Sequence, residues 1–206
     1  MIKYPTHVFF GYEDRFLQLH ILSKFLETGI KSGGKGIYIV SEQTPYNTLK
    51  LLNNCGMDAL NYSCQGQLEI LSAEDTYLAD NHFSPQKVLK LFLEIARENL
   101  KHGFKHVHFA GEMLWAYKII NKIGMVLDYE KMINPVLINQ PIAALCMYNL
   151  NFFSPETIHN FMVIHPQKVD GIDGRIIDNV NFVPEQKSIK KYIKKIIKRK
   201  KVFGKK

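Results

Sequence analysis

Short apolar runs alternate along the chain with longer segments in which apolar residues recur at helical spacing. The runs predict five strands, at residues 7–10, 36–40, 67–71, 106–110 and 142–148. Most of them are apolar at successive positions, which is typical of parallel strands that helices cover on both faces. The alternation of such strands with helices indicates βαβ units around a mostly parallel sheet.

Residues that favour helix starts and turns lie between these runs. Ser84-Pro85 and Ser154-Pro155 each combine a preferred N-cap residue with proline at the first helical position. Beyond residue 166, glycines and polar residues separate two short β-rich runs, which predicts a terminal β-hairpin. The predicted fold is a three-layer α/β domain with helices on both faces of the sheet, the terminal hairpin and a basic C-terminal helix.

Length and composition favour one soluble globular domain. The chain has 206 residues, of which 46% are hydrophobic and 22% charged, so disordered, collagen-like and disulfide-scaffold classes are excluded. Cys55, Cys64 and Cys146 show no CxxC spacing, which favours free thiols in a reducing compartment. The uncharged stretch 132–155 contains too many Asn, Gln and Pro residues to span a membrane. We expect a cytoplasmic domain at 1–185 and a tail at 186–206.

The positive charge is concentrated at the end of the chain. The formal net charge is +8, but residues 187–206 hold eleven Lys or Arg and no acid, so the other 186 residues carry 16 basic and 19 acidic side chains, a balance of −3. Isoleucines at helical spacing opposite the lysines predict a basic amphipathic helix at Lys187–Lys206. Three partners for it stay open: the chain's own domain, an anionic membrane surface, or a nucleic acid or other acidic partner.

Residues 29–36 nearly match the phosphate-binding pattern G-x-x-x-x-G-K-[ST]. Gly36 stands where a hydroxyl group would hold magnesium, and the segment ends a helix and begins a strand, which is the reverse of the order that the chemistry needs. The turn that follows the first strand carries Glu13 and Asp14, whose carboxylates repel phosphate. We therefore expect no working nucleotide site.

Histidine and cysteine spacing suggests chemistry only weakly. His102, His106 and His108 have no Cys or carboxylate placed beside them by local spacing, so we interpret them as histidines at a helix–sheet junction. Cys146 with His165 lacks a third orienting group, and a cysteine within an apolar strand is usually inert. We expect neither a metal ion nor a cofactor, and no catalytic residue.

Polar and aromatic residues follow several predicted strands. Ligands of open parallel sheets bind beyond the carboxyl ends of the strands. Aromatic walls with a few polar groups suit a small organic molecule better than a polyphosphate. The residues that we expect to line one such pocket are Tyr12, Glu13, Glu42, Glu112, Trp115, Tyr148 and His165.

An ordered series of segments over about residues 5–183 resembles the MEDS sensory domain, known from DcmR-type regulators of methanogens and methylotrophs. The segments are His7 to Glu13, Gly29 before Gly36 to Glu42, Gly66 to Leu71, Phe83 to Pro85, Gly111-Glu112 ahead of Trp115, Tyr129-Glu130, Ala144 to Tyr148, and His165-Pro166. The resemblance implies a RecA- or KaiC-like α/β layer without a working P-loop that senses small hydrocarbon derivatives in prokaryotic signalling. This chain has Glu112 where the family usually has Asp, which can change the size of a pocket.

These observations favour a stand-alone sensor that binds a small organic ligand and signals to a partner protein, as in transcription regulation. Self-association also stays open. One alternative is a KaiC- or RecA-related ATPase, or a nucleic-acid-associated protein that uses the basic tail. Another is an enzyme with Glu112 or His165 as its general base.

Overall fold

The computed structural model describes residues 4–184, apart from the side chain of Asn81. Seven strands form one sheet in the order β3-β2-β4-β5-β1-β6-β7. All neighbours pair in parallel except β6 and β7, which form an antiparallel hairpin. The predicted parallel sheet and terminal hairpin are therefore confirmed. The strands are β1 (Thr6–Tyr12), β2 (Lys35–Val40), β3 (Leu68–Ser72), β4 (Val107–Glu112), β5 (Ile142–Asn149), β6 (Gln167–Asp170) and β7 (Arg175–Asp178).

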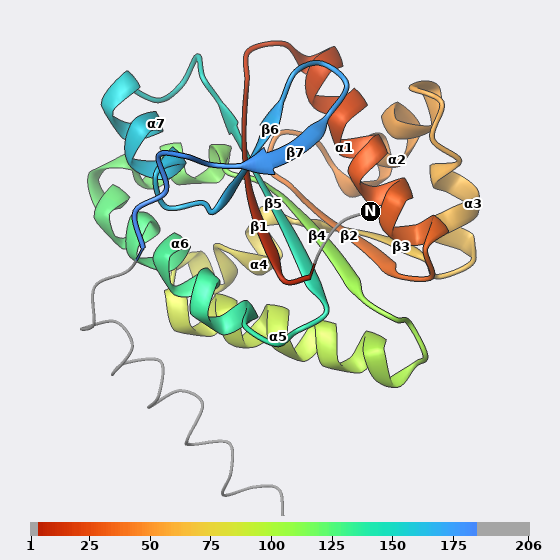
Figure 1. The fold of residues 1–206 in the computed structure, drawn as a ribbon. Helices are drawn as coiled ribbons and strands as arrows, with labels where there is room; N and C mark the ends of the chain where they lie inside the picture. The colour runs from red at the N-terminus through yellow and green to blue at the C-terminus, as the bar shows by residue number, and fades with distance from the viewer. Residues whose placement is uncertain (1–3, 185–206) are drawn as a thin grey trace, which may run out of the picture.

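Helices cover both faces of the sheet, so the predicted three-layer architecture is confirmed (Figure 1). One face packs against α1 (Arg15–Lys31), α2 (Pro45–Asn54) and α3 (Ala59–Cys64). The other packs against α4 (Ala73–Thr76), α5 (Pro85–Lys101), α6 (Ile123–Leu137) and α7 (Pro155–Met162). Two short 3-10 helices, η1 (Ala79–Asn81) and η2 (Leu114–Lys122), complete this second layer.

Each strand contributes alternate residues to two separate cores, because successive side chains of a strand point to opposite faces. On β5, Cys146 and Tyr148 belong to the core beneath α5 and α6, whereas Leu145 and Met147 belong to the core beneath α1. The same alternation holds for the other central strands. Two separate hydrophobic cores therefore lie back to back across one sheet.

The turn after β1 leads directly into α1. Asp14 is the N-cap of α1 and accepts a hydrogen bond of 2.9 Å from the amide of Leu17, so it lies before the first helical turn and not within it. Glu13 lies one residue earlier still. Residues 29–36 contain the end of α1 and the start of β2, as predicted. Gly33 in this segment has a φ of 92°.

No helix between residues 4 and 184 is both long and apolar enough to cross a lipid bilayer. The basic helix predicted at Lys187–Lys206 lies outside the described residues.

Candidate functional site

The structure does not bring the seven predicted pocket residues into one pocket. Three of them, Tyr12, Glu42 and Glu112, gather at the strand ends on the α1 face. Three are buried in the opposite layer: Trp115, Tyr148 and His165. Glu13 is exposed. The register explains the separation, because Tyr148 pairs with Gly11 and is thus one residue out of phase with Tyr12.

Glu112 is the centre of the group on the α1 face. Its side chain is fully buried and accepts hydrogen bonds from five donors. They are Arg15 Nη1 (2.7 Å), Gln18 Nε2 (3.0 Å), the hydroxyl of Tyr38 and the backbone amides of Ser41 (2.7 Å) and Glu42 (3.2 Å). Because the chain itself supplies these donors, the carboxylate is satisfied without a ligand. This group is best explained as a structural hydrogen-bond network that connects β4, α1 and the turn after β2.

The Glu112 carboxylate also sets the ionisation of its neighbours. Burial first, and then Glu112, raises the pKa of Glu42, while Arg15 opposes this shift. Burial would lower the pKa of Arg15, but the carboxylate outweighs it and raises that pKa. Arg15 is therefore committed to an internal ion pair and is not a free anion receptor.

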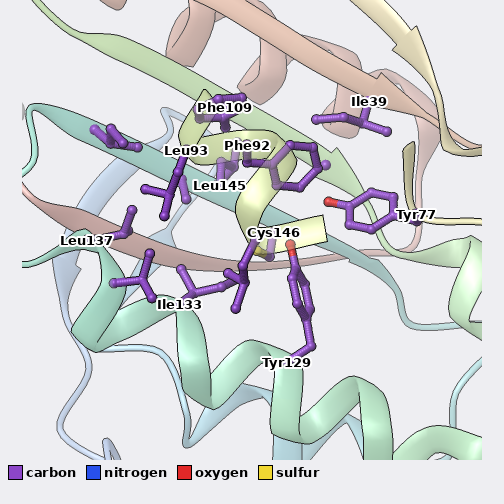
Figure 2. Close-up of a pocket in the computed structure, with 15 residues that line it drawn as sticks. Ile39, Tyr77, Phe92, Leu93, Phe109, Tyr129, Ile133, Leu137, Leu145 and Cys146 are labelled. Carbon is purple, nitrogen blue, oxygen red and sulfur yellow. The ribbon is translucent and has the colours of Figure 1, made fainter. Parts of the chain in front are cut away.

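A cavity of about 50 Å³ lies in the opposite layer, between the central strands and the helices α5 and α6 (Figure 2). Its lining is almost entirely apolar. The polar groups that it includes are the hydroxyls of Tyr77 and Tyr129 and the thiol of Cys146. The lining residues are Ile39, Tyr77, Leu89, Phe92, Leu93, Phe109, Gly111, Tyr129, Ile133, Val136, Leu137, Ile142, Ala144, Leu145 and Cys146.

Aromatic packing fixes one end of this cavity. The ring of Tyr77 stacks on Trp115 with centroids 4.5 Å apart and meets Phe92 edge-on at 5.4 Å. Burial raises the pKa of Tyr77 and of Tyr129 well above the usual value, so both hydroxyls stay protonated. Trp115 does not line the cavity itself. Its ring stacks on Tyr77, which does.

A group of four buried polar residues lies beside the cavity. It is formed by His7 on β1, Glu130 on α6, Cys146 on β5 and His165 just after α7, and we call it the buried cluster. Glu130 Oε2 is 3.2 Å from Nε2 of His7 and 3.4 Å from Nε2 of His165. Nε2 of His7 is 3.4 Å from the sulfur of Cys146. One ligand atom from each of the four lies within 4.8 Å of all the others, so they could hold a metal ion.

The far nitrogen of each histidine is held by an oxygen acceptor. Nδ1 of His7 is 2.9 Å from Oδ1 of Asn134, and Nδ1 of His165 is 2.8 Å from the carbonyl of Phe161. Asn134 uses its amide nitrogen to bond the carbonyl of Ile164, which fixes its Oδ1 as an acceptor. Both histidines must therefore carry a proton on Nδ1, and both Nε2 atoms face the cluster.

Burial and mutual contact shift the ionisation of the cluster. Burial would raise the pKa of Glu130, but hydrogen bonds and charge from the imidazoles of His165 and His7, when these are protonated, outweigh it and lower the pKa to about 2. Burial and His7 lower the pKa of His165 to about 4. Burial, followed by the charge of Glu130, raises the pKa of Cys146 well above its usual value. Cys146 is therefore a thiol at neutral pH and not an activated nucleophile.

Helix α6 connects the cavity with the buried cluster. Tyr129 and Ile133 line the cavity, whereas Glu130 and Asn134 belong to the cluster or support it. Residues four apart on a helix share a face, so these pairs form two adjacent stripes. Cys146 belongs to both sites, which makes them neighbours with a shared wall.

The sequence suggests a pair of Cys146 and His165 but no third group, because His7 and Glu130 are remote from both along the chain. A signal was present, since all four cluster residues lie in segments that carry the family resemblance. The other histidines are placed differently. His108 lies on the opposite face, where its Nδ1 is 3.0 Å from the carbonyl of Phe25 on α1, as expected for a helix–sheet junction.

The model of the family "MEDS: MEthanogen/methylotroph, DcmR Sensory domain" matches residues 6–166. The chain belongs to the MEDS family. A solved structure of a KaiC-like protein from the hyperthermophilic archaeon Pyrococcus horikoshii OT3 is similar, with a TM-score of 0.58 and 12% identity, over 81% of this chain and 72% of that one. The RecA- or KaiC-like fold is thereby confirmed. No curated protein matches the chain.

The MEDS match begins at β1 and ends at Pro166, immediately before β6. It therefore includes every residue of the cavity and of the buried cluster, and it leaves out the terminal hairpin. These two neighbouring sites are part of the MEDS domain itself.

Proposed function

We propose that this MEDS domain is a sensor that binds a small, mostly apolar organic molecule in the cavity between the sheet and helices α5 and α6. The observation that carries this proposal is the cavity itself. Well-packed interiors rarely keep voids larger than a water molecule, and an apolar void loses contacts that an apolar guest would restore. The sensory family of the chain gives such a guest a role.

The size and lining of the cavity define the class of ligand. A cavity of about 150 Å³ holds benzene, so one of about 50 Å³ fits a smaller molecule. The hydroxyls of Tyr77 and Tyr129 could hydrogen-bond one polar group of this molecule beside the sulfur of Cys146. Derivatives with one or two carbon atoms match this description.

Helix α6 is well placed to transmit binding to a partner protein. A ligand shifts a conformational equilibrium only through different affinities for two states. A guest beside Tyr129 and Ile133 would shift α6 toward whichever position binds that guest more tightly. The basic segment Lys187–Lys206 supplies a candidate contact with an anionic partner, and self-association is a second route for the signal.

Binding without catalysis is favoured over the alternatives. At the turn after β1, the carboxylate of Asp14 already caps the N-terminus of α1, and Arg15 is already paired with Glu112. An ATPase would need a free cation there. Covalent catalysis by Cys146 is disfavoured because burial raises the pKa of its thiol.

Fluorescence of Trp115, the only tryptophan of the chain, can test the proposal. We would titrate the protein with C1 and C2 alcohols, amines, thiols and halides, and expect a saturable change because Trp115 stacks on the cavity residue Tyr77. Ala144→Val, which fills the cavity, should abolish saturation, whereas Glu112→Gln on the other face should retain it. A flat response to every compound, or loss only in Glu112→Gln, would overturn the assignment of the cavity.

A further inference from the structure

We propose that the buried cluster of His7, Glu130, Cys146 and His165 binds one divalent transition-metal ion, for which Zn²⁺ is the best match. The ion would join β1, β5, α6 and the segment after α7 at a single point. This proposal does not depend on a ligand in the neighbouring cavity.

The spacing of the cluster fits tetrahedral zinc. Bonds of about 2.0–2.2 Å to nitrogen and oxygen and about 2.3 Å to sulfur place tetrahedral ligands about 3.3–3.6 Å apart. The three contacts within the cluster measure 3.2, 3.4 and 3.4 Å. The remaining separations do not exceed 4.8 Å, so small rotations of buried side chains would complete the tetrahedron.

The hydrogen-bond pattern of the buried cluster favours a bound cation. The protons on Nδ1 of His7 and His165 are already donated, so in the neutral rings both Nε2 lone pairs point toward the same carboxylate oxygen of Glu130. Among the described residues, both oxygens of Glu130 and Nε2 of His165 are buried without a well-aligned hydrogen bond. Buried acceptors that face one another are costly. A metal ion accepts all of these lone pairs.

Charge balance also favours a divalent ion. Protonating both imidazoles instead would place two cations in rings whose centroids are only 4.0 Å apart, with one carboxylate between them. A divalent ion with the thiolate of Cys146 and the carboxylate of Glu130 gives a neutral site, which burial tolerates best. Binding would release the thiol proton to solvent.

The donor set selects the type of metal. Two imidazole nitrogens, one sulfur and one carboxylate oxygen suit zinc and neighbouring transition metals, whereas magnesium and calcium prefer oxygen ligands alone. Asn134 and the carbonyl of Phe161 orient the two imidazoles, as outer partners do at established zinc sites. Four protein ligands close the coordination sphere, which is typical of a structural site.

Metal content and a cobalt spectrum test the proposal. Protein produced without a metal-binding tag should contain about one zinc ion per chain. Inductively coupled plasma mass spectrometry measures this content. Replacement by Co²⁺ should give the visible absorption of a tetrahedral site together with a sulfur-to-cobalt charge-transfer band. Protein that neither retains zinc nor takes up Co²⁺ at this site would overturn the proposal.

Cysteine variants assign the sulfur ligand. The chain has three cysteines, and Cys55 and Cys64 are exposed. The double variant Cys55→Ser/Cys64→Ser retains only Cys146 and should keep the charge-transfer band, whereas Cys146→Ser should lose it. If Cys146→Ser does not fold, the double variant alone decides, because its band could come only from Cys146. Loss of the band in the double variant would overturn the assignment.

Histidine variants complete the test. His165→Gln should lower the affinity for Co²⁺ by at least about tenfold, the size expected when even an outer partner of a metal ligand is lost. His106→Gln, on the opposite face of the sheet, is the matched control and should leave the affinity unchanged. Equal affinity in both variants would place the metal elsewhere.

Discussion

Nε2 of His7 lies 3.4 Å from the sulfur of Cys146, although 139 positions separate the two residues in the sequence. Parallel pairing of β1 with β5 produces this contact, because His7 pairs with Ala144 and Cys146 lies two residues further along on the same face. Helix α6 then places Glu130 above the pair. The sheet order therefore determines the chemistry of the buried cluster.

Metal removal should destabilise the protein. A ligand that binds only the folded state stabilises it by about 3 kcal/mol when its free concentration is about a hundred times Kd. We expect urea unfolding in excess Zn²⁺ to require a higher midpoint than unfolding in a chelator. Cys146→Ser should reduce this difference, and Cys64→Ser, at an exposed site, should retain it. Identical midpoints with and without Zn²⁺ would contradict the prediction.

Glu112→Gln should lower the free energy of unfolding by about 3 kcal/mol, because it leaves Arg15 without its buried partner. This value is the lower end of the usual cost of breaking a buried ion pair, because 30% of the Arg15 side chain is exposed to solvent. Glu42→Gln is the control, since Glu42 lies 3.7 Å from Arg15 and is partly exposed, and it should cost less than about 1 kcal/mol. Urea denaturation of both variants measures the difference. Equal losses would show that Glu112 is not the principal partner of Arg15.

More of the fold than of the candidate site could be predicted from the sequence. Apolar runs indicate buried strands locally, so the five predicted strands all appear within the sheet. Convergence of side chains depends on register and strand order, which no local pattern contains. Tyr12 is the last residue of β1 and Tyr148 the penultimate residue of β5, yet a shift of one residue between their pairing positions sends them to opposite faces. Glu42 and Glu112 do meet, because their strands β2 and β4 are neighbours.

His108 should make stability fall in mild acid. Burial lowers the pKa of this histidine from 6.5 to about 4 in the folded protein. The folded state therefore prefers the neutral ring, and the stabilisation is fully present above pH 6.5 and is lost as the pH falls toward 4. The loss amounts to at most about 3 kcal/mol.

The comparison with His108→Gln isolates this contribution. The variant cannot titrate at position 108, so the difference in unfolding free energy between wild type and variant should shrink between pH 6.5 and pH 4. His102→Gln is the control, because His102 is exposed and should leave the pH dependence unchanged. A difference between wild type and His108→Gln that stays constant over this range would contradict the prediction.

Gly111→Ala should disturb the cavity from the strand side. A Cβ at Gly111 would lie 2.6 Å from the hydroxyl of Tyr77, whose ring is held by its stack on Trp115. Displacement of this ring should cost about 1–3 kcal/mol, the usual effect of overpacking, and should change the emission of Trp115. Gly124→Ala on α6 is the matched control, because its Cβ would meet nothing within 4 Å. It should preserve the emission and raise stability by up to about 1 kcal/mol, since alanine favours a helix over glycine. Unchanged emission in Gly111→Ala would mean that Tyr77 does not hold Trp115 in place, and the fluorescence test of the cavity would then need a different reporter.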